Sequence, residues 1–286
     1  MKYLQFLLTI SLVLTFQINY AQWVKEKGNG YYKITAWTLV ADKHYTSSGA
    51  IDSNATRGNF TFSLYGEYGV TNKIDVLLYF PLFTRIYQNT QVSKTKGNVL
   101  QEGQAFNAIG DVDLGLRYSL FKKKYLAVST TLKMGLPTGR DNAGSDGSYQ
   151  TGDGEFNQLF QLDIGTSYQL YSEPSYTKAY VGFNNRTQGF SDEFHLGVET
   201  GVKFWRKLWG VGRLNIVKSF SNGTLSVQNA QGSIFANNVE YVSIGTEVAY
   251  DIVHNIGVSL TWASAISGRI IYANPSCSLG VFLDLQ

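Results

Sequence analysis

The sequence is short of the residues that crosslink chains, bind metals or break strands. It contains 1 Cys, 2 Met, 3 His and 4 Pro among 286 residues. The single cysteine, Cys277, excludes an intrachain disulfide framework. The histidines, His44, His195 and His254, fall on separate expected elements and lack the spacing of a shared metal site. We therefore expect neither a metal nor a cofactor.

Motifs of several functional classes are also lacking. The chain has no phosphate-binding loop and no dinucleotide fingerprint, and its formal net charge of +3 is too small to imply a nucleic-acid partner. Asp141, Asp146 and Asp153 lie in a Gly-rich segment without the terminal glutamate of a calcium loop, so we expect a solvated loop there. The segment SFSNG at 219–223 suggests the serine of an interfacial lipid hydrolase, but no histidine is near it in sequence. We predict no catalytic residue and no enzyme activity.

Only one long apolar run is present, and it lies at the start of the sequence. The leader MKYLQFLLTISLVLTFQINYAQ has one positive residue, an apolar stretch and a polar end, which is typical of a secretory signal peptide. We predict a signal peptide at 1–21, cleaved after Ala21, and one domain at 22–286. An uncleaved anchor is the alternative, but no second apolar helix follows. A lipid anchor is not expected because no cysteine lies near the cleavage point.

The remaining sequence is rich in Gly (29), Tyr (19) and Phe (17), as in β proteins with many turns. Its clearest pattern is a hairpin at 109–140 that alternates apolar and polar residues with a period of two. In a soluble barrel or sandwich the aliphatic face would fill the core, whereas in a membrane barrel it would meet lipid. The first strand of the hairpin sets Val112, Leu114, Leu116, Tyr118 and Leu120 against Asp111, Asp113, Gly115, Arg117 and Ser119.

Connection lengths decide between these two interpretations. About twelve segments alternate in this way, and short turns alternate with long polar loops along most of the chain, as in bacterial outer-membrane barrels. Pro81, inside the third segment, predicts a bulge or bend. The sequence therefore predicts an all-β fold, a transmembrane antiparallel up-and-down barrel with short periplasmic turns and longer extracellular loops. The expected strands are 31–40, 59–70, 74–88, 112–120, 126–136, 158–171, 177–186, 194–205, 208–220, 241–252, 256–266 and 277–285.

Charged residues fall in the polar register of these strands, where a barrel would direct them into its lumen. Two interpretations stay open: the charges pair with one another and fill the interior, or some of them line a water-filled path. Their mixed signs argue against a strongly ion-selective pore. The predicted lumen-lining residues are Glu67, Asp111, Asp113, Arg117, Lys133, Asp163, Glu199, Lys203, Arg213 and Glu247.

Three motifs carry a resemblance to a known family. GDVDLGLRY at 110–118, GLPTG at 135–139 and TGDG at 151–154 resemble the outer-membrane barrel family associated with the meta pathway of phenol degradation, which is distantly similar to long-chain fatty-acid transporter barrels. The leader end also resembles that of Bacteroidetes exported proteins. The resemblance implies a channel or transporter for small solutes, apolar or aromatic ones included. The sequence departs from fatty-acid transporters in having no room for their N-terminal hatch.

From these observations we expect a bacterial outer-membrane channel for passive passage of small solutes, with membrane lipid and a small-molecule solute as its partners. The alternative is a structural or surface-binding barrel whose lumen is plugged by its own side chains. An interfacial lipid hydrolase and a soluble secreted β protein are further alternatives from other classes.

Overall fold

The computed structural model describes residues 24–93, 95–225 and 232–285, so the predicted signal peptide lies outside the described residues. Within these ranges no helix has the length and hydrophobicity needed to span a bilayer. The strands are β1 (Gly30–Tyr45), β2 (Ile51–Gly69), β3 (Ile74–Gln88), β4 (Gln91–Val92), β5 (Val99–Gln101), β6 (Gln104–Ala108), β7 (Val112–Lys122), β8 (Leu126–Leu136), β9 (Asn157–Leu170), β10 (Glu173–Arg186), β11 (Glu193–Phe204), β12 (Leu208–Ser219), β13 (Glu240–Val253), β14 (Ile256–Arg269) and β15 (Ser276–Leu285).

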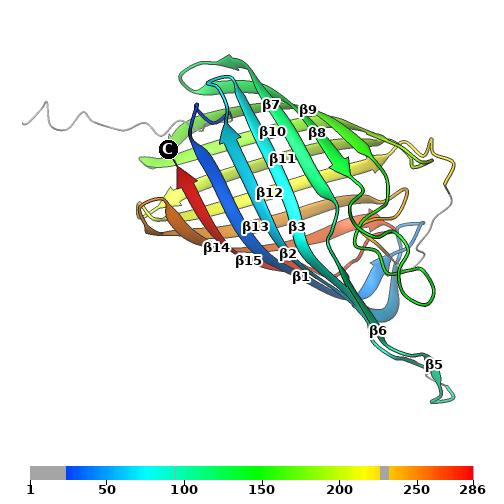
Figure 1. The fold of residues 1–286 in the computed structure, drawn as a ribbon. Helices are drawn as coiled ribbons and strands as arrows, with labels where there is room; N and C mark the ends of the chain where they lie inside the picture. Colours follow the sequence, from blue (N-terminus) through cyan, green and yellow to red (C-terminus); the bar gives the residue numbers. More distant parts are fainter. Residues whose placement is uncertain (1–23, 94, 226–231, 286) are drawn as a thin grey trace, which may run out of the picture.

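All the strands except β4 and β5 form one closed antiparallel barrel (Figure 1). From β1 to β3 and from β7 to β15 each strand pairs with its neighbours in sequence, β3 pairs with β7, and β1 closes the ring by pairing with β15 from Gly30↔Leu285 to Leu39↔Ser276. β6 and β7 share one position because both pair with β3, β7 near its start and β6 near its end. The ring therefore has 12 strand positions, which confirms the predicted twelve-stranded up-and-down barrel. The small pair β4 and β5 extends from the loop end in Figure 1.

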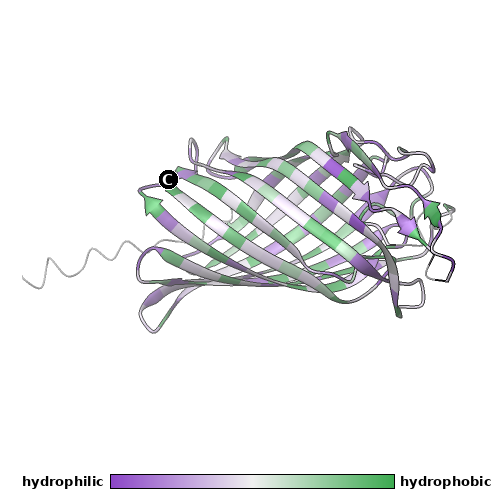
Figure 2. Ribbon diagram, turned by 90° about the horizontal axis from the view of Figure 1, so that it is seen from below, coloured by the Kyte–Doolittle hydropathy of each residue, from purple (hydrophilic) through white to green (hydrophobic). Residues whose placement is uncertain are grey.

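The barrel is apolar outside and polar inside. Along β7 the side chains of Leu114, Leu116 and Leu120 are exposed on the outer surface, while Arg117 between them is nearly buried. Figure 2 shows the resulting alternation of hydrophobic and hydrophilic residues along the strands, and more hydrophilic loops at one end. Since a soluble barrel would bury its aliphatic face, this arrangement is that of a barrel solvated by lipid.

A bulge in β3 lies at Pro81, as predicted. Phe62 pairs with Phe83 but Leu64 pairs with Phe80, so β3 carries one residue more than β2 between these pairs. Proline has no amide hydrogen for the ladder, and a bulge removes the need for one. The extra residue reverses the facing of the strand: Asp75 is buried before the bulge, and Thr84 is buried after it.

The two ends of the barrel differ. One end carries short turns, such as those between β2 and β3 and between β11 and β12, whereas the other end carries the long segments 137–156 and 220–239. At the loop end a small apolar core of Tyr45, Ala236, Val239, Ile270 and Ile271 packs two of the connections together.

Three predicted boundaries are wrong by four residues or more. β10 begins at Glu173 and not at 177. β1 ends at Tyr45 and not at 40, and β2 begins at Ile51 and not at 59, because these two strands continue as a paired hairpin past the barrel wall. Arg57 holds this extension, its Nε donating to Gln88 at 2.8 Å and its Nη2 to Ser148 at 3.0 Å.

Candidate functional site: the barrel interior and its outer rim

The barrel encloses a cavity of about 370 Å³. Its wall combines charged, amide and tyrosine side chains with Leu77. Seven of the ten predicted lumen residues line it, namely Glu67, Asp113, Arg117, Lys133, Asp163, Glu199 and Arg213. Residues that the predicted set did not include also line it, among them Lys178, Tyr65, Tyr79, Tyr180, Gln161 and Asn215.

Arg117 organises the charges on the β2, β3 and β7 side. Its Nη2 lies 2.8 Å from Glu67 Oε2 and 2.6 Å from Asp75 Oδ2, and its Nε also donates to Asp75. Asp75 is fully buried and accepts a further hydrogen bond from the backbone amide of Lys25 at 3.1 Å. The hydroxyl of Tyr65 donates to Glu67. One guanidinium thus pairs with two carboxylates and supplies the positive charge and hydrogen bonds that a buried carboxylate requires.

Arg213 organises the opposite side, on β11, β12 and β13. Its Nε lies 2.6 Å from Glu199 Oε2 and its Nη2 lies 2.7 Å from Glu247 Oε2. Each carboxylate has a second cation: Lys178 Nζ lies 2.9 Å from Glu199, and Lys33 Nζ lies 2.8 Å from Glu247. This chain of five charges reaches from β10 to β1. Lys33 and Lys178 were not in the predicted set, although they occupy the inward register of their strands.

The other predicted lumen residues have local partners. Lys133 Nζ lies 3.4 Å from Asp113, and Lys203 Nζ lies 3.0 Å from Asp251. Asp163 is buried, and accepts hydrogen bonds from Thr131 Oγ1 at 3.1 Å and from Gln161 Nε2 at 2.5 Å. The structure thus gives each of these charges a partner, while leaving a cavity between the clusters.

Asp111 lies apart from the cavity, in the loop before β7 at the outer rim. Its two carboxylate oxygens accept the backbone amides of Gly139 and Asp153, each at 2.8 Å. Thr138 Oγ1 donates to the carbonyl of Gly110 at 2.7 Å, and a Cβ on Gly152 would lie 2.1 Å from the Asp111 carboxylate. The segments 110–118, 135–139 and 151–154, separate in sequence, therefore form one hydrogen-bonded unit that fixes both ends of the segment 137–156.

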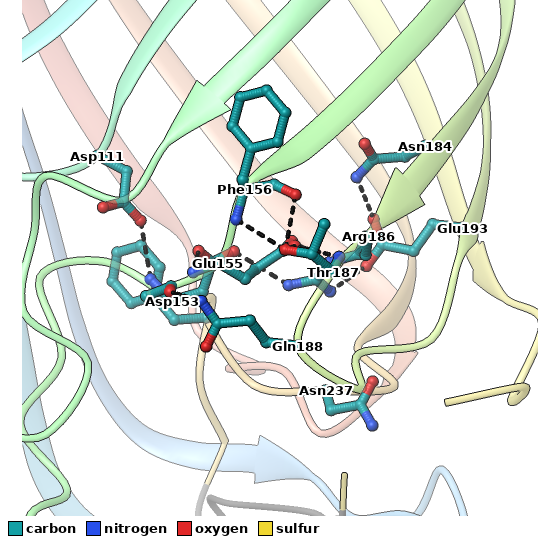
Figure 3. Close-up of polar contacts among 12 residues, drawn as sticks. Asp111, Asp153, Glu155, Phe156, Asn184, Arg186, Thr187, Gln188, Glu193 and Asn237 are labelled. Carbon is teal, nitrogen blue, oxygen red and sulfur yellow. Dashed lines mark hydrogen bonds and ion pairs between the residues drawn. The ribbon is translucent and has the colours of Figure 1, made fainter. Parts of the chain in front are cut away.

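Arg186, at the end of β10, is the centre of a second network at this rim (Figure 3). Its side chain is buried and contacts three carboxylates: Glu155 at 2.6 Å, Glu193 at 2.7 Å and Asp153 at 3.0 Å. The guanidinium also lies 4.3 Å from the centre of the Phe190 ring. Because Asp153 and Glu155 belong to the segment 137–156, Arg186 ties that segment to the barrel wall.

The Arg186 network holds more negative than positive charge. Burial, together with the neighbouring Glu155 and Asp111 carboxylates, raises the pKa of Asp153 to about 7 against the opposing effect of Arg186. Burial also raises the pKa of Asp111. His195 Nε2 lies 3.0 Å from Glu193 Oε2 in the same network. Among the described residues no group of three or more His, Cys, Asp or Glu side chains is arranged to hold a metal ion.

Comparison with known proteins places this fold. No protein-family model matches the chain, and no curated protein matches its sequence. The crystal structure of an outer-membrane channel from Pseudomonas putida F1 is similar, with a TM-score of 0.64 and 10% identity over 93% of this chain and 98% of that chain. The KdgM porin (TM-score 0.49, 6% identity, 90% and 99% covered) and the NanC porin (0.48, 7%, 89% and 100%) are more distant, and their scores are too low to support an argument.

An identity of 10% supports the fold alone. The chain has the fold of outer-membrane β-barrel channels, and its polar interior and apolar exterior agree with that class.

Proposed function

We propose that this protein is an outer-membrane channel for the passive passage of small solutes, without a cofactor and without a chemical step. The observation that carries the proposal is a cavity of about 370 Å³ inside a closed barrel whose outer surface is apolar. A barrel of this kind resides in lipid, which makes the outer membrane its location and lipid its partner. Cleavage of the leader after Ala21 is part of the proposal.

The solutes that we propose are small, and apolar or aromatic ones are included. Leu77, Tyr65, Tyr79 and Tyr180 line the cavity and supply apolar and aromatic surface among the charges. The resemblance of the motifs at 110–118, 135–139 and 151–154 to the family associated with phenol degradation supports the same solute class.

A specific observation favours a second candidate, a structural barrel with a plugged lumen. The charge chain from Lys178 through Arg213 to Lys33 links strands from β10 to β1, and segment 137–156 is fixed at the outer rim by Asp111 and Arg186. Paired charges of this kind stiffen the interior and narrow any path through it.

Electrical recordings distinguish the two candidates. The mature chain, refolded into planar bilayers, is expected to give discrete conductance steps, and liposomes that contain it are expected to swell in isotonic solutions of small neutral solutes. Folding is checked independently by the shift in gel mobility between unheated and heated samples. A folded barrel that passes neither ions nor neutral solutes would refute the channel and leave the plugged barrel.

A further inference from the structure

The ion pairs that line the cavity are asymmetric in their exposure. Lys178 is 36% exposed and Arg213 is 28% exposed, whereas their common partner Glu199 is 14% exposed. Lys133 is 41% exposed, against 28% for Asp113. Arg117 differs, being as buried as its partner Glu67. In three of these four cases the cation stands nearer to the open space than the carboxylate that neutralises it.

This asymmetry gives the cavity a preference for solutes of one charge. Positive and negative residues are equal in number along its wall, so a count of charges predicts no preference. A solute, however, interacts most strongly with the charges that are nearest to it, because the Coulomb energy falls with distance and with screening by water. The ammonium groups of Lys133 and Lys178 are more exposed than any of the carboxylates paired with cations on the wall, and Arg213 is as exposed as Asp113, so anions are the solutes that the wall attracts.

The cavity wall also carries apolar and aromatic surface beside the Arg117 cluster. Leu77 and Tyr79 on β3 and Tyr65 on β2 line the cavity, and β12, which carries Arg213, lies on the opposite side of the ring from β3. Two of the tyrosine hydroxyls donate hydrogen bonds to other protein side chains: Tyr65 donates to Glu67, and Tyr180 donates to Asn215 Oδ1 at 3.0 Å. Their rings are left to contact an apolar group. The volume of about 370 Å³ falls at the small end of ligand pockets, which span about 300–1,000 Å³.

We infer that the cavity is a binding site for small organic carboxylates with a compact apolar or aromatic body. The carboxylate lies toward Lys133, Lys178 and Arg213, and the body lies toward Leu77 and Tyr79. The inference rests on the proposed channel and names its solute class.

Binding of two matched probes tests the charge preference directly. Benzoate and benzamide have nearly the same shape and differ in charge, and each is titrated calorimetrically into the purified full-length mature barrel in detergent. Benzoate is expected to bind more tightly than benzamide. In K133Q and K178Q its affinity is expected to fall about two- to fivefold, as an accessible ion pair supports, while benzamide is unaffected. The control K123Q lies in the turn after β7, outside the cavity, and is expected to match the parent chain.

Equal affinity for the two probes, no benzoate binding, or an equal loss in K123Q would overturn the inference. Reversal potentials in a KCl gradient supply a second readout: chloride is expected to permeate better than potassium, and K133E with K178E is expected to reverse the order. Channels that conduct without anion preference would refute the site and keep the proposed function. A barrel that binds benzoate but carries no current would refute the channel and keep the site.

Discussion

At the scale of single residues, buried charges dominate both the interior and the rim. Asp75 and Glu155 are completely buried, and each is tolerated because an arginine lies within hydrogen-bonding distance. An isolated carboxylate in such a place would be several kcal/mol less stable, by about the desolvation energy of one ion. Arg117 and Arg186 therefore fix the positions of the chain segments that carry these carboxylates, in addition to compensating their negative charge.

The raised pKa of Asp153 predicts a pH-dependent attachment of the segment 137–156. A free aspartate titrates near pH ~3.9, whereas docked Asp153 titrates at about 7, so the docked segment binds a proton that the released segment lacks. This contribution to docking is complete below the lower pKa and is lost as the pH rises through about 7. A spin label at Ser145, in a C277S background, is expected to be more immobile at about pH 5 than at about pH 8.

The control is D153N, which mimics the protonated carboxyl and should abolish the transition while keeping the immobile spectrum. The same mobility change in D153N would assign the transition to another group.

Single-residue placements follow from the sequence only where the alternation is regular. Arg117 and Glu199 were predicted to face inward, and the structure places both on the cavity wall. Asp75 was not among the predicted lumen residues because Leu77 and Tyr79 share its inward register, so the inward positions of this part of β3 do not form a row of polar residues. Arg186 was not predicted because it ends a strand and pairs with carboxylates of the segment 137–156 and of the start of β11, and contacts at strand ends leave no periodic pattern.

At the scale of elements, the segment 137–156 is attached to the barrel at both of its ends. Its beginning is joined to Asp111 through Gly139, its end through Asp153, and its last residues to Arg186 through Glu155. The three family-like motifs are thus explained structurally as the two attachment points of one loop. That role was not evident from their sequences, because hydrogen bonds from a side chain to the backbone of a segment distant in sequence follow from the fold.

Removal of the Arg186 charge tests this attachment. R186Q leaves Asp153, Glu155 and Glu193 without their common cation, and breaking a buried pair costs about 3–5 kcal/mol. The free energy of unfolding in urea is expected to fall by that amount, and protease cleavage within the segment 141–150 is expected to accelerate.

R269Q is the matched control for this change. Arg269 is exposed and lies 3.9 Å from Glu240, so its loss should cost no more than about 1 kcal/mol. Equal effects of R186Q and R269Q would show that the rim network does not hold the segment.

At the scale of the whole molecule, the apolar outer surface of the barrel is suited to contact with lipid and not with water. Ile164 is exposed near the middle of β9, where lipid tails would surround it. I164R is expected to destabilise the folded barrel by about 2–4 kcal/mol in lipid vesicles, because an arginine is costly at the bilayer midplane. Y171R, in the exposed turn after β9, should be nearly neutral. The measurement is reversible unfolding in urea from vesicles, and a neutral I164R would contradict the lipid-facing assignment.

The overall architecture was the most predictable level. Strand number, the bulge at Pro81 and the facing of the 109–140 hairpin follow from a period of two and from connection lengths, and the structure agrees with each. The extended hairpin of β1 and β2 was not predicted, since its residues near Ile51 are polar and belong to no lipid-facing row. The alternation of apolar and polar residues stops where the strands leave the membrane-facing part of the barrel, and beyond that point the sequence is like that of a loop.

The pairing of β1 with β15 has a consequence for how the barrel is made. Every other strand pair of the ring joins segments that lie much closer along the chain, with connections from 2 residues up to the stretch between β3 and β7, so hairpins can form one after another. The seam from Gly30↔Leu285 joins the two ends of the domain and cannot form until the last strand has been synthesised. Until then two unpaired edges are open to other chains. Assembly is therefore an all-or-none event at its final step, and the time before that step is when the protein is most prone to aggregate.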